Sequence, residues 1–313
     1  CWDPFLAEGG AERGHAVTIA RSRSISGPFQ TNPANPILSH RSTGHPVQST
    51  AHADMVKLAD GSWAAVYLGV RPGGGTPGYH VNGRETFLAG IRWENDWPVF
   101  EESRFTVPEV DRGFVEEFAA PGYGEATAGL HPRWIAPGIH PRHIVQHDAR
   151  GGVRIQLPAG DEAHRALLAI RTEHPEWEAR ADIDADSGRL TLRLDEFHWP
   201  AVEVHADTFT ARLAIGPLEQ TLGSTPVPNM DRRQTLAVRA SRPHPGPWAQ
   251  GPVDTVELGY VVDETFHALA SFDGRYLSTE VAGGFTGRVV GVEPIDRAAS
   301  TTVRRFTYMH PSA

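Results

Sequence analysis

The chain has 313 residues, of which 40% are hydrophobic and 21% charged, and its 8 Trp, 13 Phe and 6 Tyr exclude an intrinsically disordered protein. The formal net charge of −9 argues against nucleic acid or an anionic membrane surface as a partner, because both need a basic face. Cys1 is the single cysteine, which excludes an internal disulfide, and no apolar run approaches the ~20 residues of a membrane span. These features favour an uncharged partner such as a sugar.

The N-terminus begins in the middle of a sequence pattern. Cys1-Trp2-Asp3-Pro4 has no initiator Met, and no signal peptide follows. We therefore expect a truncated or incompletely assembled start.

Short alternating runs separated by Gly, Pro, Asn and Asp predict many short strands and no helix. In the first part of the chain these runs are Val17–Ala20 and Ser62–Leu68, with an Asp60-Gly61 turn before the second. With 32 Gly and 25 Pro, the sequence predicts an all-β protein, for which sandwiches, barrels and propellers are the candidate architectures.

Two long loops and a polar linker organise the chain. The loops run over 31–49 and 71–83, and loops of this length usually carry function or are disordered. The polar stretch 107–113 follows, and the composition then changes to continuous alternating strands. We therefore expect one domain over 1–112 and a second over 113–313.

The second part is predicted to be a meander of antiparallel strands that forms a two-sheet sandwich. Its expected strands are 177–184, 189–195, 201–205, 209–215, 235–240, 254–258, 267–272, 288–292 and 304–308.

Two residues of the first part are candidates for a binding site. His52 begins a strand after a long polar loop, where it is either a structural histidine or a pocket imidazole that donates, accepts or ligates. Arg84 follows a glycine and begins a strand, where it is either a surface ion-pair partner or a fixed donor to sugar hydroxyls or carboxylates. Spacing alone does not decide between these alternatives.

The order of motifs resembles family 43 of the glycoside hydrolases, in particular its two-domain β-xylosidase/α-L-arabinofuranosidase branch. The matching segments of the first part are 7–10, 14–22, 27–29, 35–38, 52–54, 68–72, 83–86 and 96–98, and those of the second part are 195–199, 215–218 and 273–287.

The resemblance implies the last blades of a five-bladed β-propeller followed by a concanavalin A-like β-sandwich. It implies an exo-acting, inverting glycosidase that hydrolyses O-glycosyl bonds of xylo-oligosaccharides or arabinofuranosyl side chains, with two carboxyls separated by ~6.5–9.5 Å. Family members carry these carboxylates upstream of the segment that matches 7–10, so we assign no catalytic residue here and expect this fragment alone to be inactive.

The resemblance also assigns substrate-binding residues. It places His52 at the floor of the pocket, Arg84 facing sugar and carboxylates, and Phe285 on a sandwich loop at the pocket mouth, although Phe285 could equally be a core residue. No cofactor is required, metal ligands are unassigned, and Glu116-Glu117 stands where some relatives bind a structural calcium.

An alternative from another class is a non-catalytic carbohydrate-binding β-sandwich protein, with Trp177, Trp199 and Tyr276 as a stacking platform. The expected partners are xylo-oligosaccharides or arabinoxylan-derived sugars, with a homo-oligomer left open. The lone thiol and the resemblance favour a cytoplasmic location.

Overall fold

A computed structural model describes residues 14–107, 113–118, 130–184, 187–228, 233–243 and 251–311. The chain divides into two compact units, and each is described by itself. The first comprises residues 1–72 and 83–110, and the second comprises residues 73–82 and 111–313. The division follows residue 110, and the second unit also takes up residues 73–82, which the sequence places inside the first.

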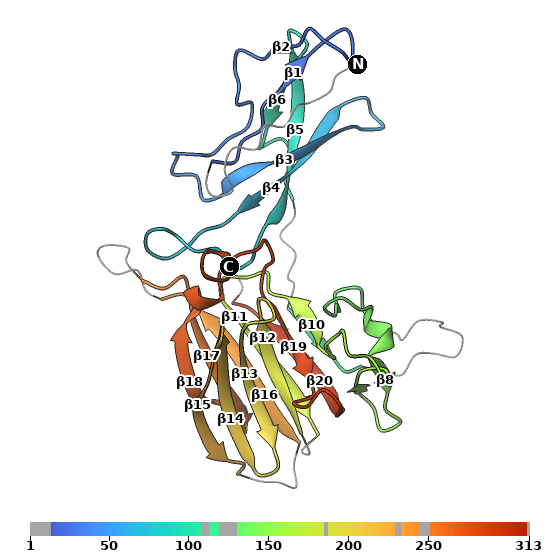
Figure 1. The fold of residues 1–313 in the computed structure, drawn as a ribbon, viewed down its shortest axis with the longest axis vertical. Coiled ribbons are helices and arrows are strands. Elements are labelled where there is room, and N and C mark those ends of the chain that lie inside the picture. The colour runs from blue at the N-terminus through green and yellow to red at the C-terminus, as the bar shows by residue number, and fades with distance from the viewer. Residues whose placement is uncertain are drawn as a thin grey trace. The chain divides into compact units, whose positions relative to one another are not determined.

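The first unit is built on a four-stranded antiparallel sheet with the order β3-β4-β5-β6 (Figure 1). A separate two-stranded ladder lies ahead of this sheet in the chain. The strands are β1 (Ala20–Arg21), β2 (Gln30–Thr31), β3 (Gln48–Lys57), β4 (Trp63–Val70), β5 (Glu85–Glu94) and β6 (Trp97–Glu101).

A small apolar cluster covers one face of this sheet. Tyr67 of β4 and Ala89 of β5 are buried there, and Phe87 of β5 packs against this cluster. The opposite face carries Val66 and Leu88 as cross-strand partners, with 43% and 38% of their surfaces exposed. The alternation follows the two-residue period of a strand.

The second unit is a sandwich of two antiparallel sheets. The six-stranded sheet has the order β10-β19-β12-β13-β14-β15, and the eight-stranded sheet has the order β18-β17-β16-β11-β20-β9-β8, with β7 paired to β20. The strands are β7 (Phe114–Glu116), β8 (Val145–His147), β9 (Val153–Ile155), β10 (Leu168–Arg171), β11 (Trp177–Ile183), β12 (Ser187–Arg193), β13 (His198–His205), β14 (Thr208–Ile215), β15 (Leu218–Pro226), β16 (Gln234–Ser241), β17 (Thr255–Val262), β18 (Thr265–Asp273), β19 (Val289–Glu293) and β20 (Thr301–Met309).

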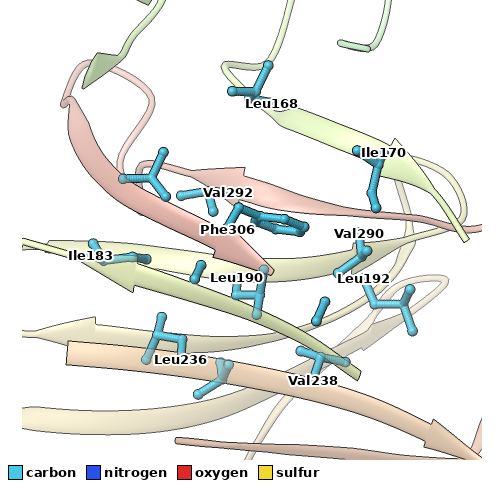
Figure 2. Packing of buried hydrophobic residues seen from close by; sticks show 14 of the residues in the cluster. Leu168, Ile170, Ile183, Leu190, Leu192, Leu236, Val238, Val290, Val292 and Phe306 are labelled. Carbon is cyan, nitrogen blue, oxygen red and sulfur yellow. The ribbon is translucent and has the colours of Figure 1, made fainter. Parts of the chain in front are cut away.

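The main core lies between these two sheets. Figure 2 shows Leu190 and Val290 from the six-stranded sheet with Leu236 and Phe306 from the eight-stranded sheet, all of them fully buried. On β11 the inward residues are buried and the outward residues are half-buried, as expected for a strand with one solvated face.

Strand β12 of the six-stranded sheet departs from this alternation, because residues on both of its faces are buried. Residues 188–193 of β12 are all buried. Trp199, Ala201 and Ala214 form a second small apolar cluster, and Arg189 and Glu293 form a buried ion pair at 3.0 Å. Buried ions persist only when they are paired and hydrogen-bonded, as this pair is.

The prediction of an all-β protein is confirmed, but the second part is not a simple meander. β19 inserts between β10 and β12, and β20 lies between β11 and β9, so strands distant in sequence are neighbours. The nine strand ranges expected there do not include β7 to β10 or β15. No helix was expected where a single turn, α1 (Thr279–Ala282), and the 3-10 turns η1 (Pro141–His143) and η2 (Gly274–Leu277) form. Among the described residues, no helix is long and apolar enough to cross a membrane.

Candidate functional site

His52 lies at an irregular point of β3. The pairing of β3 with β4 shifts between Gln48 and Ala51 and again between Ala51 and Asp54, which marks two β-bulges. His52 falls in the second shift and has a left-handed φ of 57°. Non-glycine residues rarely adopt this conformation, and bulges near functional sites re-aim side chains. The local backbone therefore sets the direction of the His52 ring.

The environment of His52 is polar and open. The side chain is exposed, whereas Ala51 and Ala53 on either side are buried in the apolar cluster. Its ring centroid lies 6.5 Å from that of the buried His15. Asp54 is also exposed, so two polar groups leave the sheet from this part of β3.

Arg84 lies in a bend immediately before β5 and is partly buried. Leu68 of β4 pairs with Ala51 of β3 on one side and with Thr86 of β5 on the other. Neighbouring strands are ~4.8 Å apart, so Ala51 and Thr86 are separated by about 10 Å across the sheet. His52 on β3 and Arg84 immediately before β5 therefore belong to the same end of one sheet, on the two sides of β4.

Two carboxylates of the first unit are engaged in structural contacts. Glu85 accepts two hydrogen bonds from Arg71, at 2.8 and 2.6 Å. Glu102 accepts from the Tyr67 hydroxyl at 2.6 Å, and its other oxygen lies 3.0 Å from His40 Nε2. Burial opposes ionisation of Glu102, but the bonds from Tyr67 and His40 outweigh it and lower the pKa of this carboxyl. Sequence reasoning did not single out the Tyr67–Glu102–His40 group, whose members are distant in sequence.

Phe285 belongs to the second unit and lies between α1 and β19. Its side chain is 63% exposed, which rules out the alternative of an ordinary core phenylalanine. Transfer of apolar surface from water is favourable, so a ligand that covers this exposed ring would gain affinity. The prediction that His52, Arg84 and Phe285 share one sugar site stays a prediction.

The predicted stacking platform of the carbohydrate-binding alternative is wrong for two of its three members. Trp177 and Trp199 are only 4% and 8% exposed, so their faces are not available to a sugar. Trp177 stacks on Tyr308, and Arg189 lies over the Trp199 ring at 4.8 Å. Tyr276 is 43% exposed.

The calcium expected at Glu116-Glu117 also stays a prediction. Glu116 accepts from the Trp134 indole at 3.4 Å, and Glu117 pairs with Arg305 at 3.2 Å. Within the described ranges, no group of three or more His, Cys, Asp or Glu side chains could hold a metal ion.

Comparison with protein-family models gives two adjacent matches. Residues 5–98 match the model of glycosyl hydrolases family 43, and residues 151–310 match the β-xylosidase C-terminal concanavalin A-like domain. The second match alone covers half of the chain. The chain belongs to glycoside hydrolase family 43. The first match includes both His52 and Arg84, and residues 7–10, which carried part of the resemblance, lie outside the described residues.

Several family 43 proteins are similar to this chain. A non-reducing end α-L-arabinofuranosidase from Bacteroides ovatus is 50% identical over 142 residues, which cover 43% of this chain and 26% of that protein. A xylosidase/arabinosidase from Humicola insolens is 39% identical over 344 residues, covering 98% of this chain and 62% of that protein. The solved structure of a xylan β-1,4-xylosidase from Bacillus halodurans superposes with a TM-score of 0.77 at 21% identity, covering 96% and 61% of the two chains. This family 43 chain thus spans less than two thirds of its relatives' length, and the solved structure supports the fold alone.

Proposed function

We propose that this chain forms part of an exo-acting, inverting glycosidase that cleaves β-1,4-xylosides or α-L-arabinofuranosides from xylo-oligosaccharides or arabinoxylan. The observation that carries the proposal is that His52 on β3 and Arg84 immediately before β5 lie at the same end of one sheet, inside the part that matches the family 43 model. The similar proteins carry xylosidase or arabinosidase names, which supports a pentose as the sugar.

His52 and Arg84 are proposed to bind the sugar rather than to cleave it. An imidazole donates to or accepts from hydroxyls, and a guanidinium offers a rigid fork of donors. The charge of Arg84 would also favour the ionised form of a nearby carboxylate, which suits the general base of an inverting enzyme. Phe285 would close the sugar face at the pocket mouth.

The proposal places the catalytic acid and base outside these 313 residues. Inversion needs two carboxyls ~6.5–9.5 Å apart, one of them protonated near neutral pH. The bonds from Tyr67 and His40 lower the pKa of Glu102, which does not suit it for a general acid, and both oxygens of Glu85 are already bonded to Arg71. The exposed pair Val66 and Leu88 is the kind of apolar surface that a further propeller blade would cover.

Two measurements test the proposal. Calorimetric titration of the chain with xylobiose should detect binding that His52→Ala and Arg84→Ala each weaken by at least about tenfold, because each removes hydrogen bonds worth ~1.5–3 kcal/mol. His205→Ala and Arg23→Ala, at exposed positions, serve as matched controls. The chain alone should not hydrolyse 4-nitrophenyl xyloside or arabinofuranoside. Clear turnover would show that the catalytic carboxylates lie within it.

A further inference from the structure

Residues 73–82 connect β4 to β5 but pack within the sandwich unit. Gly75 N donates to Gly251 O at 3.0 Å, near the start of the segment. Gly74 lies so close to this region that an added Cβ would come within 2.9 Å of the Gly251 carbonyl oxygen. The chain therefore leaves the first unit after β4, docks on the sandwich, and returns to begin β5.

The end of this segment is bonded at three consecutive residues. His80 N donates to Glu280 Oε2 at 3.0 Å, the Val81 carbonyl accepts from Arg288 N at 3.1 Å, and Asn82 Nδ2 donates to the Glu173 carbonyl at 3.2 Å. Val81 is buried. Two residues span at most about 7 Å of chain, so the position of Asn82 limits where Arg84 can lie.

The His80 side chain makes two short contacts with residues of the sandwich. Its Nδ1 lies 2.6 Å from Glu280 Oε1, and its Nε2 lies 2.6 Å from Thr279 Oγ1. The side chains of His80 and Glu280 are only 16% and 23% exposed, so solvent screens this pair weakly. Hydrogen bonds to an ionised partner are about twice as strong as neutral ones.

Both hydrogen bonds of the His80 ring can form whether the imidazole is neutral or protonated. In neutral His80, Nδ1–H donates to Glu280 and Nε2 accepts from the Thr279 hydroxyl. In protonated His80, both ring nitrogens donate, and the hydroxyl oxygen becomes the acceptor. His80, Thr279 and Glu280 are together called the clasp. Because its bonds do not require one charge state, the clasp is not a pH switch.

We propose that His80 is a positioning residue, which, through Glu280 and Thr279, holds the segment that ends at Asn82 and so limits where Arg84, two residues further along the chain, can lie. The inference rests on the proposed role of Arg84 in sugar binding. Gly83, with φ 72°, lets the chain turn between the clasped residues and Arg84, which follows in a bend. His80 would then contribute to substrate affinity without touching the sugar.

Three variants of the 313-residue chain test the clasp. His80→Ala removes both side-chain bonds, Glu280→Gln removes the charge but keeps an oxygen for His80 N–H, and Thr279→Val removes the hydroxyl. His164→Ala is the matched control, because His164 also bonds a carboxylate, Asp161 at 2.9 Å, but within a single loop. The readouts are hydrogen exchange of the amides at 79–87, the NMR signal of Arg84 Nε–H, and the dissociation constant for xylobiose.

We expect His80→Ala and Glu280→Gln to speed exchange over 79–84 by about tenfold or more, to shift the Arg84 Nε–H signal and to weaken xylobiose binding by at least about fivefold. His80→Gln should restore part of each effect, and the His164 control should change none of them. Unchanged exchange at 79–84 would disprove the clasp, and faster exchange with an unchanged Arg84 signal would disprove the positioning role. A wild-type chain that binds no xylobiose would instead refute the proposed function, while the Arg84 signal still decides this inference.

Discussion

The buried ion pair between Asp254 and Arg288 should be among the strongest single supports of the sandwich unit. Their side chains are only 3% and 1% exposed, and both guanidinium Nη atoms of Arg288 bond Asp254, Nη2 at 3.1 Å. Arg288 also donates from Nε to the Leu277 carbonyl at 3.0 Å and from Nη2 to the Gly274 carbonyl. Asp254→Asn would leave this guanidinium buried with an amide N–H facing one of its donors.

Removing one partner of a buried ion pair costs ~3–5 kcal/mol, because the remaining charge stays desolvated. For a domain of ~200 residues each kcal/mol lowers the melting temperature by about 2–4 °C, so Asp254→Asn should lower the sandwich transition by roughly 6–20 °C. Replacing both residues, as Asp254→Leu with Arg288→Met, should recover part of the loss. The recovery should be incomplete, since the Leu277 and Gly274 carbonyls lose their donor.

Urea unfolding followed by tryptophan fluorescence measures these changes in the free energy of unfolding. Glu219→Gln is the control, because Glu219 pairs with Arg212 on the surface, where the side chains are 48% and 36% exposed, and such pairs contribute only ~0–1 kcal/mol. If Asp254→Asn destabilised the protein no more than Glu219→Gln, the argument that desolvation dominates this pair would be wrong.

Three further predictions follow from burial and charge. Burial opposes ionisation of Glu293, but Arg189 and Arg165 outweigh this effect and lower the pKa of its carboxyl. The stability that ionised Glu293 contributes should therefore be complete above about pH 4.3, the pKa of a glutamate in the unfolded chain. It should be lost as the pH falls through the lower pKa that Glu293 has in the folded protein. The stability gap between wild type and Glu293→Gln, about 3 kcal/mol at pH 7, should therefore narrow in urea titrations below about pH 4, and a constant gap would contradict this. Gly274→Ala should destabilise the protein by more than about 2 kcal/mol in the same assay, because the added Cβ would lie 1.8 Å from a carboxylate oxygen of the buried Asp254. Gly251→Ala is the control and should leave the stability unchanged, because its Cβ meets no atom within 4 Å. Phe285→Ala should weaken xylobiose binding by roughly fivefold to tenfold with the free energy of unfolding unchanged, while Phe197→Ala, at an equally exposed ring, should alter neither.

Local alternation was enough to find most strands of the second unit. The nine expected runs each correspond to a strand, from β11 to β20, because inward apolar and outward polar residues alternate there. β15 was not predicted, because its sequence, Leu218–Pro226, is largely polar and most of its residues are exposed. The order of strands in each sheet could not be predicted either, since a local pattern carries no information on which distant strands pair.

Alternation shows that two faces exist but not which of them is covered. Trp177 points into the core between the sheets and Trp199 lies in a separate cluster, so neither forms a binding platform. The sequence could not reveal this, because a tryptophan at a strand position fits a buried face and an exposed face equally well. Residues 188–193 of β12 illustrate the same point. They alternate in sequence between apolar and polar, yet the residues on both faces of the strand are buried.

The candidate site was found from motif order, but its geometry depends on features that motifs do not describe. His52 was assigned to a strand, and the structure adds that the strand bulges there with a left-handed φ. The loop 71–83 was expected to carry function or disorder, yet most of it packs on the sandwich through His80 and Glu280, separated by 200 residues. A contact between residues 200 apart in sequence forms late, because the entropy cost of closing so long a loop has to be overcome first. The lead-in to Arg84 should therefore be ordered late in folding.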